Sequence, residues 1–288
     1  MTYLDLTLGR AGHASKVIST LEPGSTFIGV DRDQNALKFS TEFLLPYSKT
    51  IKQYFLHSTF STACLTLKES GFKGADFILM DIGVSSPQFD DPSRGFSYRF
   101  DSPLDMRMDQ GDKITARDII NTYDERELSR VFRELGQCKV YYPVVRKILE
   151  ARQQKPIETT FELVDIIKSS LPARELRKEG HPAKQFFLGL RYEVNGEIEE
   201  LKKGLERAVN FLNHKGRLVI ISFNSEEDKI VKDLFKSLTD DRHVDKYAKD
   251  KVEEGYVALT KKPLVPTEEE IKENNRAKSS IMRALERR

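Results

Sequence analysis

Short apolar runs alternate with helical stripes over the first third of the chain. The apolar runs predict strands at residues 3–8, 26–30, 51–56 and 77–82. Between the first and second runs, Val17, Ile18 and Leu21 have helical spacing. Between the second and third runs, the apolar positions from 36 to 44 have it. The run at 77–82 is almost entirely apolar, as expected of a strand covered on both faces. This alternation predicts an α/β fold with a parallel, doubly wound sheet.

The middle of the chain shows helical patterns only. Asp124 with Glu127 and Thr159 with Glu162 have the spacing of capping boxes, and an apolar stripe follows each pair. A third stripe runs from 144 to 149. A series of helices within an α/β pattern predicts an inserted all-helical subdomain, which we place at residues 104–184. The sheet domain then comprises residues 1–103 and 185–288.

The α/β pattern resumes after this insertion. A helical stripe begins at Ile198, a strand is expected at 218–223, and Ser225 is expected to cap the helix that follows. A last strand is expected at 256–260. The tail from Thr267 is rich in charge and is expected to be loosely ordered.

Composition places the chain among soluble globular proteins. Hydrophobic residues make up 39% and charged residues 32% of its 288 positions. No apolar run approaches the roughly 18 residues of a membrane span, and the first residues lack the pattern of a signal peptide. The two cysteines, Cys64 and Cys138, form no zinc-binding pattern, so two reduced thiols in a cytoplasmic protein are expected.

The formal net charge is only +2, yet basic residues are concentrated in two segments. Residues 139–155 and residues 271–288 each carry a local charge of +4, with five basic against one acidic and six against two. Each segment fits a surface that contacts phosphates, and each equally fits a solvated helix face. Charge alone does not decide between these two interpretations.

The first predicted strand leads into a glycine-containing turn, at Gly9 and Gly12. Such a turn lets the backbone approach a ligand, and the second strand ends in Asp31, a carboxylate that can accept hydrogen bonds from ribose hydroxyls. The combination predicts a nucleotide-type cofactor. A plain turn with a capping Asp31 is the alternative. The third glycine of the dinucleotide fingerprint is absent, which disfavours a dinucleotide oxidoreductase.

The fourth predicted strand ends in Asp81, and the loop after it reads Ile-Gly-Val-Ser-Ser-Pro-Gln. Ligands of doubly wound sheets lie beyond the carboxyl ends of the strands. A carboxylate there, followed by small residues, suits a loop that touches both cofactor and substrate. The alternative is a turn in which Asp81 caps backbone amides.

These segments together carry a close resemblance to a known family. In order along the chain they read Asp5-Leu-Thr-Leu-Gly-Arg-Ala-Gly-His, Val30-Asp-Arg-Asp, Asp81-Ile-Gly-Val-Ser-Ser-Pro-Gln, Arg94-Gly-Phe-Ser, Pro103-Leu-Asp-Met-Arg-Met-Asp, His181-Pro-Ala, Arg191-x-x-Val-Asn, Ile221-Ser-Phe-x-Ser and Lys261-Lys-Pro. The chain resembles the MraW/RsmH family, the S-adenosylmethionine-dependent methyltransferases that act on a cytosine N4 of small-subunit ribosomal RNA. The likeness covers nearly the whole chain.

The resemblance implies a class I methyltransferase (Rossmann-like) sheet with an inserted helical domain. It also implies the cofactor, S-adenosyl-L-methionine, and places its contacts at Ala11, Gly12, His13, Asp31, Phe60, Asp81 and Gln88. Asp31 would take the ribose, Phe60 would lie against the adenine, and Asp81 would also act in catalysis by accepting a hydrogen bond from the target amine. The implied substrate is the cytosine numbered 1402 of 16S ribosomal RNA, in naked RNA or in the 30S subunit, and no metal is implied.

Several positions depart from the family pattern. Ala11 stands where the family usually has glycine, Asn224 where it has histidine, and Gln137-Cys138 where it has an acidic pair. The family's N-terminal segment before the first strand is also missing. The changes fall mainly in the half that would face RNA, so a divergent paralogue that binds cofactor or RNA without methyl transfer is the alternative function.

A flipped cytosine alone offers little binding energy, so the RNA must also be held elsewhere. The insertion carries basic residues suited to phosphate contacts, and the candidates for RNA binding are Lys139, Arg146, Lys147 and Arg152.

Overall fold

The computed structural model describes residues 1–239 and 255–288. Contacts divide the chain into two units, Met1–Gly83 with Glu199–Arg288, and Val84–Ile198. The predicted insertion at 104–184 lies within the second unit, which starts earlier and ends later in the sequence. Each unit has a hydrophobic core of its own.

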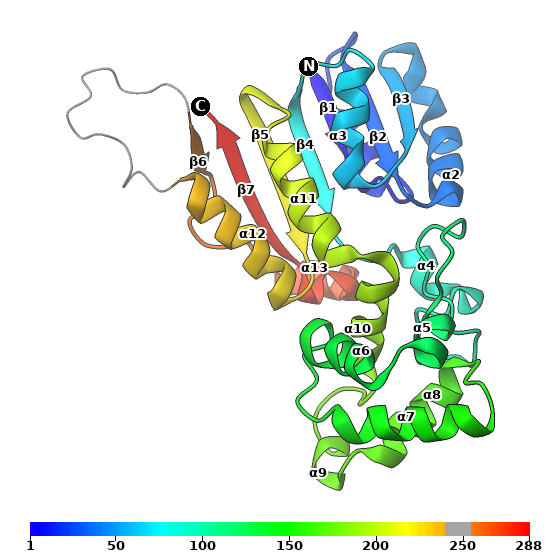
Figure 1. Cartoon of the computed structure of the whole chain (residues 1–288). Coiled ribbons are helices and arrows are strands. Elements are labelled where there is room, and N and C mark those ends of the chain that lie inside the picture. The colour runs from blue at the N-terminus through cyan, green and yellow to red at the C-terminus, as the bar shows by residue number, and fades with distance from the viewer. Residues whose placement is uncertain (240–254) are drawn as a thin grey trace. The chain divides into compact units, whose positions relative to one another are not determined.

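The first unit is built on a seven-stranded sheet (Figure 1). Its strands are β1 (Thr2–Asp5), β2 (Thr26–Asp31), β3 (Lys52–His57), β4 (Ala75–Asp81), β5 (Leu212–Ser222), β6 (Tyr256–Ala258) and β7 (Ile281–Arg287). The spatial order is β3-β2-β1-β4-β5-β7-β6, with β1 to β5 parallel and β7 antiparallel to both of its neighbours. The expected class I methyltransferase sheet is confirmed.

Two cores cover the two faces of this sheet, because successive strand side chains point to opposite sides. Leu4 of β1 belongs to the core that includes residues of α3 (Phe60–Glu69), α11 (Glu197–Val209) and α12 (Ser225–Leu238). Tyr3 belongs to the core that includes residues of α1 (Gly12–Ile18) and α2 (Gln34–Leu44). A short helical turn, η1 (Leu45–Lys49), follows α2. The doubly wound arrangement predicted from the sequence is therefore confirmed.

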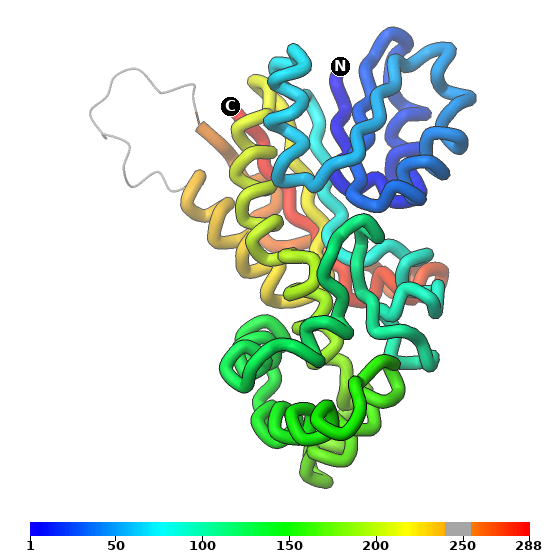
Figure 2. Tube along the Cα trace, turned by 45° about the vertical axis from the view of Figure 1, so that its right-hand side comes forward, coloured from blue at the N-terminus to red at the C-terminus, as the bar shows by residue number. Residues whose placement is uncertain are grey.

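Residues 84–198, the second unit, contain only helices as regular elements (Figure 2). They are α4 (Ser86–Asp90), η2 (Pro92–Arg94), α5 (Ala116–Thr122), α6 (Glu125–Arg130), the π-helical turn η3 (Val131–Leu135), α7 (Tyr142–Gln154), α8 (Thr160–Ser170), α9 (Ala173–Leu176) and α10 (Lys184–Asn195). Both expected capping boxes are present, at the starts of α6 and α8.

Three local expectations were wrong. The tail from Thr267 is not loosely ordered: it forms α13 (Glu268–Glu273), η5 (Asn275–Ser279) and strand β7, in which Leu285 is fully buried. The expected last strand, at 256–260, is therefore the next-to-last. Asn224, not Ser225, caps α12, because its side-chain oxygen accepts hydrogen bonds from the amides of Glu226 and Glu227 in the first turn. Within the described ranges, no helix combines the length and apolar character that crossing a bilayer demands.

Candidate cofactor and substrate site

The turn between β1 and α1 has a left-handed backbone at two positions. Gly9 has φ 53° and Ala11, the N-cap of α1, has φ 58°. An alanine in this region is uncommon because its Cβ crowds the backbone. The Ala11 side chain is fully buried, and Gly12 follows it with open space around its Cα. The backbone at Gly12 is thus accessible from the side where a side chain would stand.

Asp31, at the end of β2, ties this turn to the neighbouring strand. Its Oδ2 accepts a hydrogen bond from the Gly9 amide at 2.7 Å, and its Oδ1 accepts one from the Asp33 amide at 2.8 Å. Burial raises the pKa of Asp31 to about 6 despite these hydrogen bonds. Each carboxylate oxygen can accept a second hydrogen bond, so Asp31 can shape the turn and still accept from a ligand hydroxyl.

Asp81, at the end of β4, lies beside His13 of α1. The Asp81 Oδ2 atom is 3.3 Å from His13 Nε2. The other oxygen, Oδ1, is buried and has no hydrogen-bond partner among the described residues. The carboxylate of Asp81 raises the pKa of His13, mainly by accepting its hydrogen bond. Asp81 therefore presents a free acceptor, and the alternative in which its side chain caps backbone amides is not realised within the described chain.

The sequence analysis missed Asp5 as a member of this cluster. Its carboxylate is 1% exposed, accepts from the Tyr3 hydroxyl at 3.0 Å and from the Thr7 amide at 3.1 Å, and has a pKa raised by burial to about 7. Asp81 contributes to that rise by its negative charge. The available signal was positional, because Asp5 ends β1 as Asp31 ends β2 and Asp81 ends β4.

Phe60 is the first residue of α3, directly beyond the carboxyl end of β3. Its ring packs against Gly204 of α11 so closely that a Cβ at position 204 would come within 2.4 Å of the ring. Phe60 is half-buried, so one part of the ring is held by the core and another part remains accessible.

Gln88 belongs to the second unit, where it closes the first turn of α4. Its Oε1 accepts from the Ser85 amide at 3.1 Å, and the residue is 6% exposed. The strand-end residues and Gln88 are therefore positioned by separate cores.

The most distinctive motif, Pro103 to Asp109, is held by two other motifs of the second unit. Asn195 accepts from the Met108 amide at 2.8 Å and donates to the Met106 carbonyl at 2.8 Å. The Arg94 guanidinium donates to the carbonyls of Arg107 and Met108. These hydrogen bonds hold Met106 in a left-handed backbone, with φ 63°, in a position that is fully buried.

The four basic candidates on the insertion differ in the partners that their side chains have within the protein. Arg152 donates to the carbonyls of Ile120 and Tyr123, at 2.9 and 2.7 Å, and so links α7 to the end of α5. Arg146 and Lys147 have acidic neighbours at 3.8 and 3.7 Å, namely Glu125 and Glu150. Lys139 is exposed.

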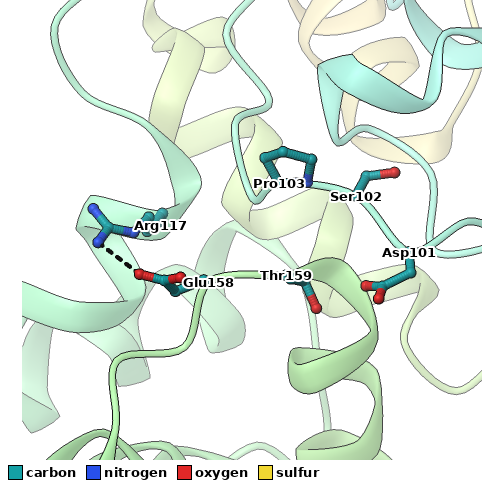
Figure 3. Close-up of a pocket in the computed structure, with 6 residues that line it drawn as sticks. All are labelled: Asp101, Ser102, Pro103, Arg117, Glu158 and Thr159. Carbon is teal, nitrogen blue, oxygen red and sulfur yellow. Dashed lines mark hydrogen bonds and ion pairs between the residues drawn. The ribbon is translucent and has the colours of Figure 1, made fainter.

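A pocket of about 360 Å³ lies elsewhere in the second unit (Figure 3). It is lined by Asp101, Ser102, Pro103, Arg117, Glu158 and Thr159. Arg117 and Glu158 form an ion pair at 3.0 Å across part of it. The Ser102 hydroxyl is buried with no hydrogen-bond partner among the described residues.

The strand-end residues of the first unit fit a nucleoside-type cofactor. They offer a glycine turn, a carboxylate suited to hydroxyl groups, an aromatic ring at the start of α3 and one carboxylate oxygen without a partner. In the described part of the chain, no group of His, Cys, Asp and Glu side chains is arranged to hold a metal ion.

Comparison with known proteins finds relatives that match nearly the whole chain. The chain is 41% identical to the ribosomal RNA small subunit methyltransferase H of Streptococcus mutans, covering 99% of this chain and 91% of that protein. The protein of that name from Mesoplasma florum is 42% identical, over 99% and 92% of the two chains. A solved rRNA methylase from Streptococcus thermophilus shares 8% identity, covers 99% of this chain and 86% of its own, and has a TM-score of 0.40. The family model described as the MraW methylase family matches residues 1–288, so the chain belongs to the MraW methylase family.

Proposed function

We propose that this protein transfers the methyl group of S-adenosylmethionine to the N4 amine of a cytosine in small-subunit ribosomal RNA. One observation carries the proposal: Asp81 presents a buried oxygen without a partner, beside strand-end residues that suit a nucleoside cofactor, in a chain of a methylase family. The names of its relatives, ribosomal RNA small subunit methyltransferases, support the substrate class. The N4 atom is the finer part of the proposal, and it rests on the motif resemblance.

The residues of the first unit have distinct parts in this reaction. The backbone at Ala11 and Gly12 and the side chain of His13 contact the methionine end of the cofactor, Asp31 accepts from the ribose, and Phe60 lies against the adenine. Bound S-adenosylmethionine supplies a methyl group activated by its positive sulfur. For Gln88, in the second unit, the motif resemblance alone supports a contact with the cofactor.

The target amine is a poor nucleophile, because its lone pair is delocalised into the cytosine ring. The Asp81 carboxylate, whose side chain is 28% exposed, accepts a hydrogen bond from that amine, which orients the amine and increases its electron density. The nitrogen lone pair would form the new N–C bond, and the cofactor sulfur would keep the electrons of the broken C–S bond. The amine then carries an extra proton, and the Asp81 carboxylate receives it.

The second unit is proposed to hold the RNA around the flipped base. Lys139, Arg146 and Lys147 remain candidates for phosphate contacts. Arg152 is used within the unit, and its hydrogen bonds to two carbonyls make it a weaker candidate.

The test is an assay with the full chain, methyl-labelled S-adenosylmethionine and small ribosomal subunits that lack the modification. We expect label in the RNA, and digestion to nucleosides should place it in N4-methylcytidine. Label in another nucleoside would reject the N4 assignment. Tight binding of cofactor and RNA with no transfer, to subunits or to naked 16S RNA, would favour the divergent paralogue instead.

A further inference from the structure

Two aromatic rings of the second unit, outside the candidate cofactor residues, form an ordered stack. Tyr98 lies in the segment after η2, and His181 lies in the segment before α10. Their ring centroids are 4.3 Å apart and the planes differ by only 7°. Phe187 of α10 contacts Tyr98 edge-on, with centroids 5.6 Å apart and an angle of 89°. Phe187 thus supports a stack whose two members are only half-buried.

The imidazole of His181 is fixed in orientation. Its Nδ1 accepts a hydrogen bond from the Ala183 amide at 3.2 Å. A neutral imidazole that accepts at Nδ1 carries its proton on Nε2, so this ring presents an N–H donor at its other nitrogen.

The positive charges of two side chains affect the protonation of His181 in this stack. Burial lowers the pKa of His181, and the positive charges of Lys168 and Arg99 lower it further, with no described carboxylate opposing them. Arg99 and Lys168 are exposed, and neither forms an ion pair with a described residue. The stack therefore lies in a positive local field, unlike Arg146 and Lys147, each of which has a carboxylate nearby.

We propose that Tyr98, His181, Arg99 and Lys168 form a binding surface for a single-stranded nucleotide of the RNA substrate, and we call this surface the Tyr98 platform. A base stacks against the aromatic pair, and the two cations contact the neighbouring phosphates. The proposal rests on the proposed function for the identity of the RNA.

Three features favour RNA over a protein partner. Single-stranded RNA is recognised by stacking of unstacked bases on Tyr, His, Phe or Trp rings. Stacking tolerates any base, and unpaired cations beside the rings supply the backbone contacts that such sites combine with it. An acidic peptide would use the cations but would leave the parallel aromatic faces without a matching group.

The test measures the affinity of the full chain for a fluorescently labelled single-stranded RNA at several salt concentrations. The Tyr98→Leu variant, which keeps an apolar side chain but removes the ring, should weaken binding about tenfold, as loss of one base–aromatic stack does. Tyr98→Phe keeps the ring and should bind as the unmodified chain does. Thermal unfolding of both variants shows whether the fold is retained, and a Tyr98→Leu variant that unfolds early is replaced by Tyr98→Met.

Charge is tested with two matched double variants. Arg99→Gln with Lys168→Gln should weaken RNA binding and make its salt dependence shallower by about 0.7 for each lost contact. Arg146→Gln with Lys147→Gln removes the same charge from α7 and should have a smaller effect. No loss from the Arg99 and Lys168 double variant, or no loss from Tyr98→Leu, would overturn the platform.

The result is separable from the proposed function, because binding is measured without methyl transfer. If the platform variants lose RNA affinity in a chain that transfers no methyl group, the proposed reaction fails and the platform stands. If methyl transfer occurs and Tyr98→Leu binds and turns over normally, the platform fails alone. Loss of affinity for an acidic peptide of the same charge, without loss for RNA, would assign the surface to a protein partner instead.

Discussion

Two strand-end carboxylates of the sheet unit differ from two partly exposed carboxylates of the helical unit in the direction of their pKa shifts. In the sheet unit, burial raises the pKa of Asp5 to about 7 and that of Asp31 to about 6. In the helical unit, the Thr115 hydroxyl lowers the pKa of Asp118, and Lys155 lowers that of Glu162. The helical carboxylates cap helices and form ion pairs, so their ionisation stabilises the fold. The ionised forms of Asp5 and Asp31 destabilise the fold, and such perturbed groups are typical of sites that serve a ligand or a reaction.

The largest expected effect is the loss of folding stability when the buried Asp5 carboxyl ionises. Its pKa is raised, so the folded state binds the proton more tightly than the unfolded chain, and the stability this gives is lost as the pH rises from about 4 through 7. The ionisation of Asp5 should therefore lower the free energy of unfolding by about 4 kcal/mol, because each unit of difference in pKa corresponds to about 1.4 kcal/mol. Asp5→Asn should remove this pH dependence while keeping an acceptor for the Thr7 amide.

Urea unfolding of both proteins between pH 5 and pH 8 provides the measurement. Asp31 has a raised pKa of the same sign, so part of the slope below about pH 6 should remain in the variant. Parallel curves for the two proteins would show that Asp5 carries no such cost.

Asp81 should show a large effect on the reaction rather than on stability. Asp81→Asn keeps the shape but weakens the acceptor, and loss of a positioned acid–base group costs about a hundredfold or more in rate. The cofactor dissociation constant should change much less. Single-turnover rates at saturating cofactor, compared with calorimetric dissociation constants, separate the two. Equal losses in rate and affinity would make Asp81 a cofactor ligand only.

Asp31 should affect cofactor affinity. Asp31→Ala removes the acceptor for the Gly9 amide as well as the proposed contact to ribose, so affinity should fall about tenfold or more, as expected for hydrogen bonds to a charged group. Asp31→Asn keeps one oxygen for the turn and should lose less. Calorimetry on both variants would contradict the assignment if binding of S-adenosylmethionine were unchanged in Asp31→Ala.

The last prediction compares two arginines of α7, one that is hydrogen-bonded within the helical unit and one that forms only an exposed ion pair. Arg152→Ala should lower the free energy of unfolding by about 1–3 kcal/mol, because two carbonyls lose their donor. Arg146→Ala removes an exposed pair and should change it by less than about 1 kcal/mol. Denaturant unfolding of the two variants is the comparison, and similar losses would mean that the α7 cations share one role.

Local patterns predicted the parts of the fold that depend on neighbours in sequence. The first four strands and the two capping boxes follow from apolar runs and from residues three positions apart. Strand β7 was missed because it carries three charged residues in a tail of high charge, and this composition does not show that Leu285 packs into a distant core. Helix α3 was not foreseen either, although its buried face, Ala63, Cys64 and Leu67, has helical spacing.

The candidate site shows the same limit. Asp31 and Asp81 could be named as candidates because parallel strands bring their carboxyl ends to one edge of the sheet. The Asn195 side chain forms hydrogen bonds with the backbone of Met106 and Met108, almost ninety positions away. A contact over that distance leaves no pattern among neighbouring residues of the sequence. The ion partners of Arg146 and Lys147 depend on how helices pack, so counting charges along the chain could not show them.

The position of β7 has a consequence for how the protein is made. Residues 281–287 form the strand between β5 and β6, so until they leave the ribosome the two strands have no partner on that side. The nascent chain must carry β5 with an open edge while some sixty more residues are synthesised, and open edges invite pairing with other chains. Production at lower temperature, or with a chaperone that shields strand edges, should therefore raise the soluble yield more than a change of codons early in the gene.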